Sequence, residues 1–390
     1  MTKAGNITEQ IISTAEDLGF LRIAITPATD LPRGDSALQN WLESDFHGSM
    51  DFMAKHGRRD DPQKVLEGAK TLIVAALPYD SSHPLKTLDS SGRPKGFIAR
   101  YARGRDYHEV LREKLLDLGE ACSQIIGRPV ISRPCIDTAP LLEREYASQA
   151  GLGFIAKSTM LLIPGFGTYF LLGELLLDIE LPATEPISPK CGRCTACLDA
   201  CPTGAFVSER VLDARKCVSY FTIEYGGSIP LEYRKPMGNM VFGCDICQEV
   251  CPYNLSKREK PVAPEFAPMP GLEEPDLIDL LQITSSRHRK LVKGTALRRA
   301  PRKQLMRNAA IALGNSNNPA AVEPLVDALQ NNRYPIVRSH AAWALGELKA
   351  THIVETLIEA LTKEDDESVQ LEIKDAIVRL KEMTHDRKAQ

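Results

Sequence analysis

The sequence predicts a multidomain α+β/α protein in which an α/β domain is followed by a cysteine-rich domain and a C-terminal α-solenoid. Three observations carry this prediction. Helical and strand-like apolar patterns alternate over roughly the first 180 residues, eight of the ten cysteines fall between residues 191 and 251, and the C-terminal part repeats itself. At 390 residues the chain exceeds one ordinary core, so we expect two or three domains.

The first elements are a helix and two strands. Apolar residues at helical spacing predict a helix over 7–19, capped by Asn6. Runs of apolar and β-branched residues predict strands over 21–25 and 71–77. A second, longer helix is predicted over 109–126.

The rest of this first domain alternates in the same way. Asp137 and Pro140 predict the start of a helix that runs to Gly151, because proline is tolerated in a first helical turn. Apolar stretches at 160–163 and 169–177 predict buried strands. These elements complete an α/β domain over residues 1–180.

The cysteines form two spaced groups. The first reads C-x2-C-x2-C-x3-C-P from Cys191 to Pro202, and the second joins Cys217 to a C-x2-C-x3-C-P run from Cys244 to Pro252. The first spacing is that of bacterial two-cluster ferredoxins, in which the last cysteine before the proline binds the other cluster. This rule predicts two [4Fe-4S] clusters, one held by Cys191, Cys194, Cys197 and Cys251 and the other by Cys201, Cys217, Cys244 and Cys247.

Zinc ribbons and disulfides are the alternatives at these cysteines. A zinc site needs only four ligands, and the C-x2-C-x2-C triplet suits three corners of a cubane better than a tetrahedral ion. The two clusters therefore define a ferredoxin-like domain over residues 181–262. Iron-bound thiolates need a reducing compartment, and no apolar signal-peptide core begins the chain, so we expect a cytoplasmic protein.

One connecting segment lies within the second cysteine group, and another follows it. Residues 218–243 form an insertion that either covers a second cofactor or is only a loop, and the sequence leaves both open. Residues 263–300 are rich in proline and then in basic residues, which predicts a linker.

The C-terminal part repeats with an offset of 32 residues. The segment from Asn308 to Gly314 matches that from His340 to Gly346, and a third, weaker copy lies near 369–380. This period predicts HEAT-like helix pairs over residues 301–390, with Trp343 in their core.

A basic segment precedes and enters these repeats. Residues 280–322 contain no Asp or Glu, although the formal net charge of the whole chain is −3. Such a segment favours binding to a polyanion, and nucleic acid is the favoured partner. The alternative is a helix face that contacts only solvent. We predict phosphate contacts by Arg298, Arg299, Arg302 and Lys303.

The order of the motifs resembles that of the epoxyqueuosine reductases. The resemblance rests on the segment from Arg100 to His108, on Asp137-Thr-Ala-Pro140, on the glycine-containing segment from Gly151 to Lys157, and on the cysteine pattern followed by HEAT-like repeats. It implies an oxidoreductase, related to reductive dehalogenases, that uses cobalamin and two [4Fe-4S] clusters to reduce epoxyqueuosine to queuosine in the final step of queuosine biosynthesis. The implied substrate is tRNA with a GUN anticodon, modified at the wobble position.

The resemblance also implies roles for single residues. Asp137 is expected to be the proton donor, although its position before Pro140 also suits a helix cap. The first domain, residues 1–180, is expected to bind cobalamin. The implied cobalamin contacts are Arg59, Ala99, Arg100, Asp137, Thr138, Ala139, Pro140, Leu141, Leu142, Leu161, Leu172, Ser219, Cys244 and Asp245.

An external one-electron donor, such as a flavodoxin or ferredoxin, is expected to reduce the clusters, which pass electrons to cobalamin. The chain is expected to be a monomer without membrane contact. Two other classes stay open at this point: a ferredoxin-like electron carrier without cobalamin, and a redox-sensing nucleic-acid-binding protein. A reductive dehalogenase is disfavoured, because its chemistry needs neither the basic segment nor the repeats.

Overall fold

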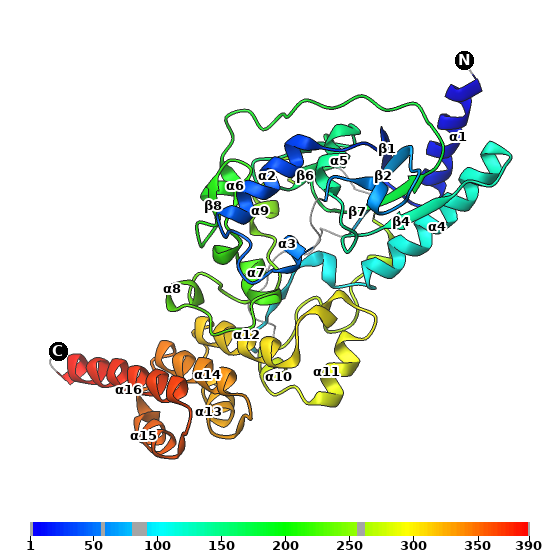
Figure 1. Cartoon of the computed structure of the whole chain (residues 1–390). Coiled ribbons are helices and arrows are strands. Elements are labelled where there is room, and N and C mark those ends of the chain that lie inside the picture. Colours follow the sequence, from blue (N-terminus) through cyan, green and yellow to red (C-terminus); the bar gives the residue numbers. More distant parts are fainter. Residues whose placement is uncertain (1–2, 56–58, 80–91, 256–261, 389–390) are drawn as a thin grey trace. The chain divides into compact units, whose positions relative to one another are not determined.

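The computed structural model describes residues 3–55, 59–79, 92–255 and 262–388, and the chain divides into two compact units. The first unit combines residues 1–82, 100–215 and 245–267. The second combines residues 83–99, 216–244 and 268–390. Each unit is therefore built from segments that lie far apart in the sequence (Figure 1).

A four-stranded antiparallel sheet forms the centre of the first unit. Its strand order is β1-β2-β7-β4, with bounds Arg22–Pro27, Thr71–Pro78, Phe170–Leu177 and Ser132–Cys135. Every residue of β2 is buried, because this strand has a neighbour on each side and a layer on each face. The three strands predicted at 21–25, 71–77 and 169–177 are confirmed.

Helices cover one face of this sheet. They are α1 (Lys3–Asp17) and α4 (Tyr107–Ile126), which pack on each other (Figure 1). Alternate strand residues such as Ile25, Ile73 and Leu175 face the apolar residues of these helices in one continuous core. The helix predicted over 109–126 is confirmed. The first helix begins at Lys3, so Asn6 lies within it and does not cap it.

The opposite face of the sheet is covered by α5 (Glu143–Gln149). Tyr146, Ala147 and Ala150 pack there against Leu72, Val74 and other strand residues. The predicted helix start at Asp137 is wrong, because α5 begins six residues later. The segment between β4 and α5 forms turns in which the N–H groups of Thr138 and Ala139 both donate to the Ile136 carbonyl.

Apart from α2, the remaining helices and strands of the first unit are short. The strand predicted at 160–163 is confirmed as β6, which pairs antiparallel with β5. These remaining elements are α2 (Pro32–Glu43), α3 (Phe52–Lys55), β5 (Phe154–Ile155), β6 (Leu161–Leu162), α6 (Ala196–Asp199), β8 (Phe206–Ser208), β9 (Val211–Leu212) and α9 (Ile246–Glu249).

The second unit consists mainly of stacked helices. The contacts join α12 (Arg302–Asn315) to α14 (Pro335–Glu347) and α14 to α16 (Glu367–Lys388), while α13 (Val322–Asn331) and α15 (Val354–Lys363) pack on the helices that follow them. Gly314 permits one of these close approaches, since a methyl group there would lie 2.8 Å from Cα of Ala344. The predicted helix-pair repeat and the burial of Trp343 are confirmed.

Smaller elements precede the repeats. Strand β3 (Phe97–Ile98) pairs parallel with β10 (Met240–Phe242), which follows α7 (Val218–Ile223) and α8 (Leu231–Arg234). The segment predicted as a linker contains α10 (Leu277–Leu281) and α11 (Ser285–Val292). In the part of the chain that the structure describes, no helix is long and apolar enough to cross a membrane.

Arg307 fastens the 218–243 segment to the first repeat helix. Its side chain is fully buried, and its guanidinium donates to the carbonyl oxygens of Phe221, Tyr225 and Gly227 at 2.6–2.7 Å. Asn308 extends this contact by donating to the carbonyls of Thr222 and Val241. The insertion is therefore an integral part of the second unit.

Candidate active site

Asp137 lies at a partly open position of the first unit. It follows β4 in the turn segment that precedes α5, and its side chain is 42% exposed. Leu142 occupies the N-cap position of α5, so Asp137 does not cap that helix. The carboxyl group is thus available for another role.

Two neighbouring side chains donate to the two carboxyl oxygens of Asp137. The Tyr107 hydroxyl donates to Oδ2, and Nε2 of His108 lies 2.8 Å from Oδ1. The two rings stack with their centroids 4.0 Å apart. This contact fixes the orientation of the carboxyl group from both sides.

Asp106 contacts His108 through the ring nitrogen that does not face Asp137. It is buried and caps α4 by accepting a hydrogen bond from the main chain of His108 at 3.1 Å. The same oxygen lies 2.7 Å from Nδ1 of His108. One carboxylate therefore places the start of the helix and also the imidazole ring, which leaves Nε2 pointing at Asp137.

The charge of His108 follows from these contacts. Burial lowers its pKa, but the hydrogen bonds to Asp106 and Asp137 outweigh burial and raise the pKa to about 9. Burial raises the pKa of Tyr107, and the Asp137 charge adds to this effect. At neutral pH the site therefore contains an imidazolium and a neutral phenol, both of which donate to Asp137.

Two further carboxyl groups lie near Asp137. Glu143 is the first residue of α5, and Glu174 is fully buried in β7, where it is paired with Cys135 of β4. Neither was predicted from the sequence as a site residue. A single acid within the apolar run Phe170–Leu177 was the available signal for Glu174.

Four cysteines come together in the first unit. Cys191 and Cys251 pack against the same small core of Phe154, Ala156 and Leu162. Burial raises the pKa of the Cys251 thiol, and the nearby Cys191 and Cys194 raise it further. Burial likewise raises the pKa of Cys197, helped by Cys251 and Cys191. These are the four ligands predicted for one cubane. Among the described residues no group of three or more His, Cys, Asp or Glu is arranged to hold a metal ion, so this ligand set stays a prediction.

The four cysteines predicted for the other cluster are divided between the two units. Cys201 and Cys247 belong to the first unit, whereas Cys217 and Cys244 belong to the second. The Ala205 N–H donates to the Cys201 sulfur at 3.3 Å, a contact that suits a thiolate. This ligand set stays a prediction. Cys122 and Cys135 are buried elsewhere in the first unit, as ordinary core thiols.

The predicted cobalamin contacts of the first unit include a buried ion pair. The Arg100 N–H donates to Asp245 at 2.9 Å, and its guanidinium reaches Asp245 at 3.2 Å and Glu249 at 2.7 Å. Arg100 and Asp245 are both buried. This pair joins the start of the 100–102 turn to α9, next to Cys247.

Other predicted contacts form an apolar rim. Ala139, Leu142 and Leu172 are partly buried at the edge of the core beneath α5, and Leu161 lies within it. Arg59 is buried there as well, and among the described residues nothing accepts from its Nε. An apolar rim with a spare N–H donor fits a large ring that carries carboxamide groups. Ala99, Ser219 and Cys244 belong to the second unit.

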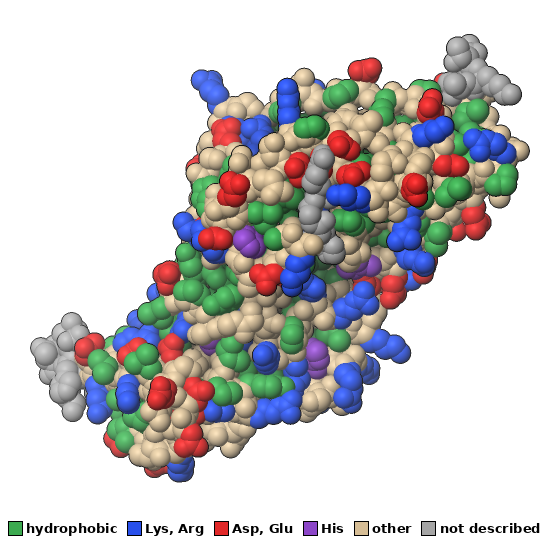
Figure 2. Space-filling model, in the orientation of Figure 1, with side chains coloured by type: hydrophobic (Ala, Val, Ile, Leu, Met, Phe, Trp, Pro, Cys, Tyr) green, Lys and Arg blue, Asp and Glu red, His purple; other side chains and the backbone are tan. Residues whose placement is uncertain are grey.

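The predicted tRNA contacts differ in their exposure and pairing. Arg298 and Lys303 are exposed, Arg299 pairs with Glu224 at 2.7 Å, and Arg302 lies over the ring of Tyr334. The segment 280–322 itself contains no acid, and the partner of Arg299, Glu224, comes from a distant part of the sequence. Figure 2 shows Lys and Arg side chains gathered over α11 and the start of α12.

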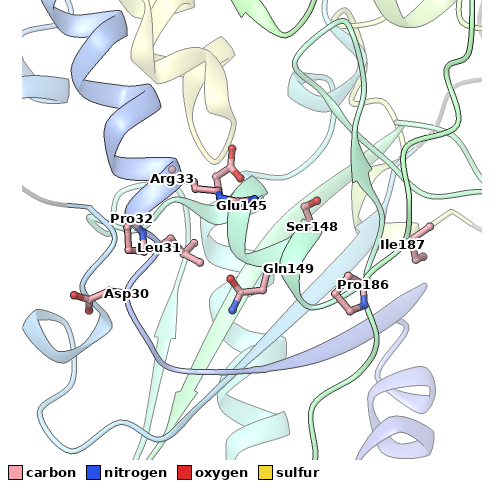
Figure 3. Close-up of a pocket in the computed structure, with 10 residues that line it drawn as sticks. Asp30, Leu31, Pro32, Arg33, Glu145, Ser148, Gln149, Pro186 and Ile187 are labelled. Carbon is pink, nitrogen blue, oxygen red and sulfur yellow. The ribbon is translucent and has the colours of Figure 1, made fainter.

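A separate cavity of about 500 Å³ lies in the first unit (Figure 3). It contains none of the predicted site residues. Its lining residues come from the start of α2, from α5 and from Pro186 and Ile187.

Three family models match the chain. One described as "Epoxyqueuosine reductase QueG, DUF1730" matches residues 59–138, a 4Fe-4S double cluster binding domain matches residues 190–254, and HEAT repeats match residues 294–377. The second match resolves the choice between iron–sulfur clusters and zinc, and the third confirms the predicted repeats.

Known proteins resemble the chain over most of its length. An epoxyqueuosine reductase of Vibrio cholerae is 42% identical over 87% of this chain and 92% of its own length. A crystal structure of an epoxyqueuosine reductase with an epoxyqueuosine-modified tRNA-Tyr stem loop has a TM-score of 0.89 at 33% identity, covering 97% of this chain and all of that one. A Bacillus subtilis structure, with its catalytic aspartate loop swung out of the active site, has a TM-score of 0.86 at 32% identity, covering 96% and 99%.

Proposed function

The chain belongs to the epoxyqueuosine reductase family, and we propose that it reduces the epoxide of epoxyqueuosine in tRNA to the alkene of queuosine. The observation that carries this proposal is the position of Asp137, a partly exposed carboxyl group held by Tyr107 and His108. The Bacillus subtilis relative has a catalytic aspartate loop, which supports the same role for this segment.

The reaction removes one oxygen atom as water. It needs two electrons and two protons for each epoxide, and the electrons come one at a time from an external donor such as a flavodoxin or ferredoxin. Asp137 passes to the epoxide oxygen a proton that the His108 imidazolium supplies to it, because among the acids of this site Asp137 is the partly exposed one that a substrate can reach. Tyr107 and His108 keep its carboxyl group aimed at that oxygen.

Cobalamin fits the apolar rim of the first unit. Leu142, Leu161 and Leu172 would contact the ring, and the Arg59 N–H would donate to one of its carboxamides. When bound, the two clusters and cobalamin provide a one-electron relay and the cobalt chemistry that opens the epoxide. The protein's own contribution is to bind, to orient and to deliver protons.

The tRNA substrate accounts for the basic segment of the second unit. Arg298 and Lys303 are exposed and would contact phosphates, which position a nucleic acid without reading its sequence. A tRNA substrate and iron-bound thiolates both favour the cytoplasm as the place of action. One solenoid is sufficient for one tRNA, so we propose that the protein acts as a monomer.

An anaerobic turnover assay tests this function. The protein is purified with iron and cobalamin, reduced, and mixed with tRNA that carries epoxyqueuosine. We expect the modified nucleoside to lose one oxygen atom in mass spectrometry, and no loss when cobalamin is left out. An unchanged nucleoside in the complete mixture would contradict the proposal, and full activity without cobalamin would contradict the assigned cofactor.

A further inference from the structure

Three repeat helices carry a polar residue at the same position. These residues are Asn308 of α12, His340 of α14 and Glu372 of α16, and each follows the previous one by the repeat offset of 32 residues. Asn308 and His340 are fully buried, where a polar side chain is costly unless it is hydrogen-bonded. All three contact the segment 218–243, so the repeats bind a part of their own chain through one equivalent position.

Two of these residues hold the middle of the segment. Nε2 of His340 accepts a hydrogen bond from the Ile229 N–H at 3.2 Å, while its Nδ1 lies 2.7 Å from the carbonyl oxygen of Ile336. Glu372 accepts a hydrogen bond from the Arg234 guanidinium at 2.6 Å. Both contacts lie away from the two ends of the segment, so they anchor it without fixing those ends.

Asn308 holds the two ends. Its Nδ2 donates to the Thr222 carbonyl at 3.0 Å and to the Val241 carbonyl at 2.8 Å. Thr222 belongs to α7, which begins directly after Cys217. Val241 belongs to β10, which ends two residues before Cys244. Helix α12 packs against both elements, and one amide of this helix therefore joins the two elements that flank these cysteines.

The Thr222 hydroxyl joins the same two ends more directly. It accepts a hydrogen bond from the Gly243 N–H at 2.9 Å and donates to the Val218 carbonyl at 2.9 Å. Gly243 directly precedes Cys244, and Val218 directly follows Cys217. Thr222 is fully buried, so these bonds are made away from solvent. The main chain beside each cysteine is therefore tied to one hydroxyl group.

We propose that the repeats have a second role besides binding tRNA, which is to position Cys217 and Cys244 as two ligands of the second predicted cluster. Asn308 and Thr222 are the positioning residues, and they act through the cysteines. Residues that orient the ligands of a metal centre control its assembly and tune its properties. The double-cluster family model covers both cysteines, which supports this use of them. The inference rests on the proposed function, in which the clusters carry the electrons.

Asn315 provides the comparison that separates positioning from stability. It lies on the same helix as Asn308, and its Nδ2 also donates to two main-chain carbonyls of the segment, those of Arg234 and Gly238, both at 2.9 Å. Neither carbonyl belongs to a residue next to a cysteine. Loss of this donor should therefore lower the stability of the protein without moving the two thiols.

EPR spectroscopy of the reduced, cluster-loaded protein without tRNA provides the first test. Thr222→Val keeps the shape of the side chain but removes the hydroxyl group, whereas Thr222→Ser keeps the hydroxyl group. We expect Thr222→Val to lose or shift the signal of the second cluster, with the iron content falling towards half, while the other cluster keeps its signal. Thr222→Ser should resemble the wild type. A wild-type spectrum and iron content in Thr222→Val would overturn the inference.

A redox titration of two asparagine variants provides the second test. Asn308→Asp keeps the oxygen that accepts from Arg307 and loses the donor to both carbonyls. Asn315→Asp is the matched control. We expect both variants to unfold at lower urea concentration, but only Asn308→Asp to shift the reduction midpoint of the second cluster. Equal midpoints in the two variants would reduce Asn308 to a structural role. If Asn308→Asp does not fold, the two Thr222 variants decide the question.

The outcomes separate this inference from the proposed function. The two tests use no substrate, so they do not depend on turnover. A wild-type protein that assembles only one cluster would refute the positioning role. A wild type with both clusters and the expected behaviour of the variants, but with no product from modified tRNA, would refute the proposed function alone.

Discussion

At the scale of the residue, the site depends on one imidazole held between two carboxyl groups. His108 contacts Asp106 through Nδ1 and Asp137 through Nε2, so rotation of its ring would break both hydrogen bonds. The positive charge that these carboxylates stabilise is also what orients Asp137. The residue next to it, Tyr107, completes the arrangement from the same helical turn.

Replacing His108 tests this arrangement through pH. The folded-state pKa of about 9 exceeds the ordinary value of 6.5, so protonated His108 stabilises the fold fully below pH 6.5, and this stabilisation is lost as the pH rises through about 9. We expect His108→Gln to lower the free energy of unfolding at pH 6.5 and to have a much smaller effect above pH 9.

Urea denaturation at several pH values measures this difference. Tyr107→Phe is the matched control, because it removes the other hydrogen bond to Asp137 but no group that titrates in this range. Its effect should not vary with pH. A pH-independent loss of stability in His108→Gln would show that His108 is not held as a cation.

The sequence could predict Asp137 only through a family resemblance. From spacing alone, an aspartate before Pro140 suits a helix cap, and only the structure places α5 six residues later. Glu143 and Glu174 escaped prediction for a different reason. Their proximity to Asp137 depends on how α5 lies across the sheet, and a single sequence carries no record of that packing.

At the scale of the element, regular patterns were predicted well and long-range pairing was not. The long helix α4, the strands of the central sheet and the 32-residue repeat follow from local periodicity. The basic segment shows what local patterns cannot predict, because the absence of acidic residues from a segment does not tell which of its side chains are exposed. Arg307 belongs to that run and is fully buried, because carbonyl groups some 80 residues earlier in the chain accept its hydrogen bonds.

Replacing Arg307 tests how the 218–243 segment is attached. Arg307→Lys cannot reach all three main-chain carbonyls, and each buried acceptor left without a donor costs about 1–3 kcal/mol. We expect a loss of about 3 kcal/mol or more in the free energy of unfolding, measured by urea denaturation. Arg289→Lys on the exposed side of α11 is the control. Equal stability of the two variants would contradict the structural role.

The cysteines assigned to one cluster allow a separate prediction. Cys251 lies with Cys191, Cys194 and Cys197 although it follows them by more than 50 residues. We expect Cys251→Ala to disturb that cluster in the EPR spectrum of the reduced protein, to lower the iron content towards half, and to leave the other cluster intact. Cys122→Ala, at a buried core thiol, should change neither. Loss of only the Cys201-containing cluster would contradict the assignment.

At the scale of the whole molecule, separate regions of the chain carry separate tasks. Residues 190–254 match a double-cluster domain and residues 294–377 match HEAT repeats, while the central sheet of the first unit positions Asp137. The chain as a whole matches epoxyqueuosine reductases over most of its length. We propose that the electron relay, Asp137 and the basic surface serve one reaction.

The basic surface predicts a salt-dependent interaction with tRNA. Arg298→Glu with Lys303→Glu should weaken tRNA binding, and the slope of log affinity against log salt should fall by roughly 0.7–0.9 for each phosphate that the protein no longer neutralises. Filter binding at several salt concentrations measures both quantities. The control is Arg22→Glu with Lys70→Glu, two exposed residues of the first unit with the same change in charge. Equal affinity and equal salt slope in the two double variants would show that the basic surface only contacts solvent.

The role of Asp137 as proton donor is tested most sharply by the single-turnover rate of Asp137→Asn on epoxyqueuosine-modified tRNA. The amide keeps the shape of the side chain but carries no acidic proton. We predict that the variant retains iron and cobalamin and loses roughly 10²–10⁴-fold in rate, which is the usual worth of general acid catalysis. A wild-type rate in a fully loaded Asp137→Asn protein would contradict this role.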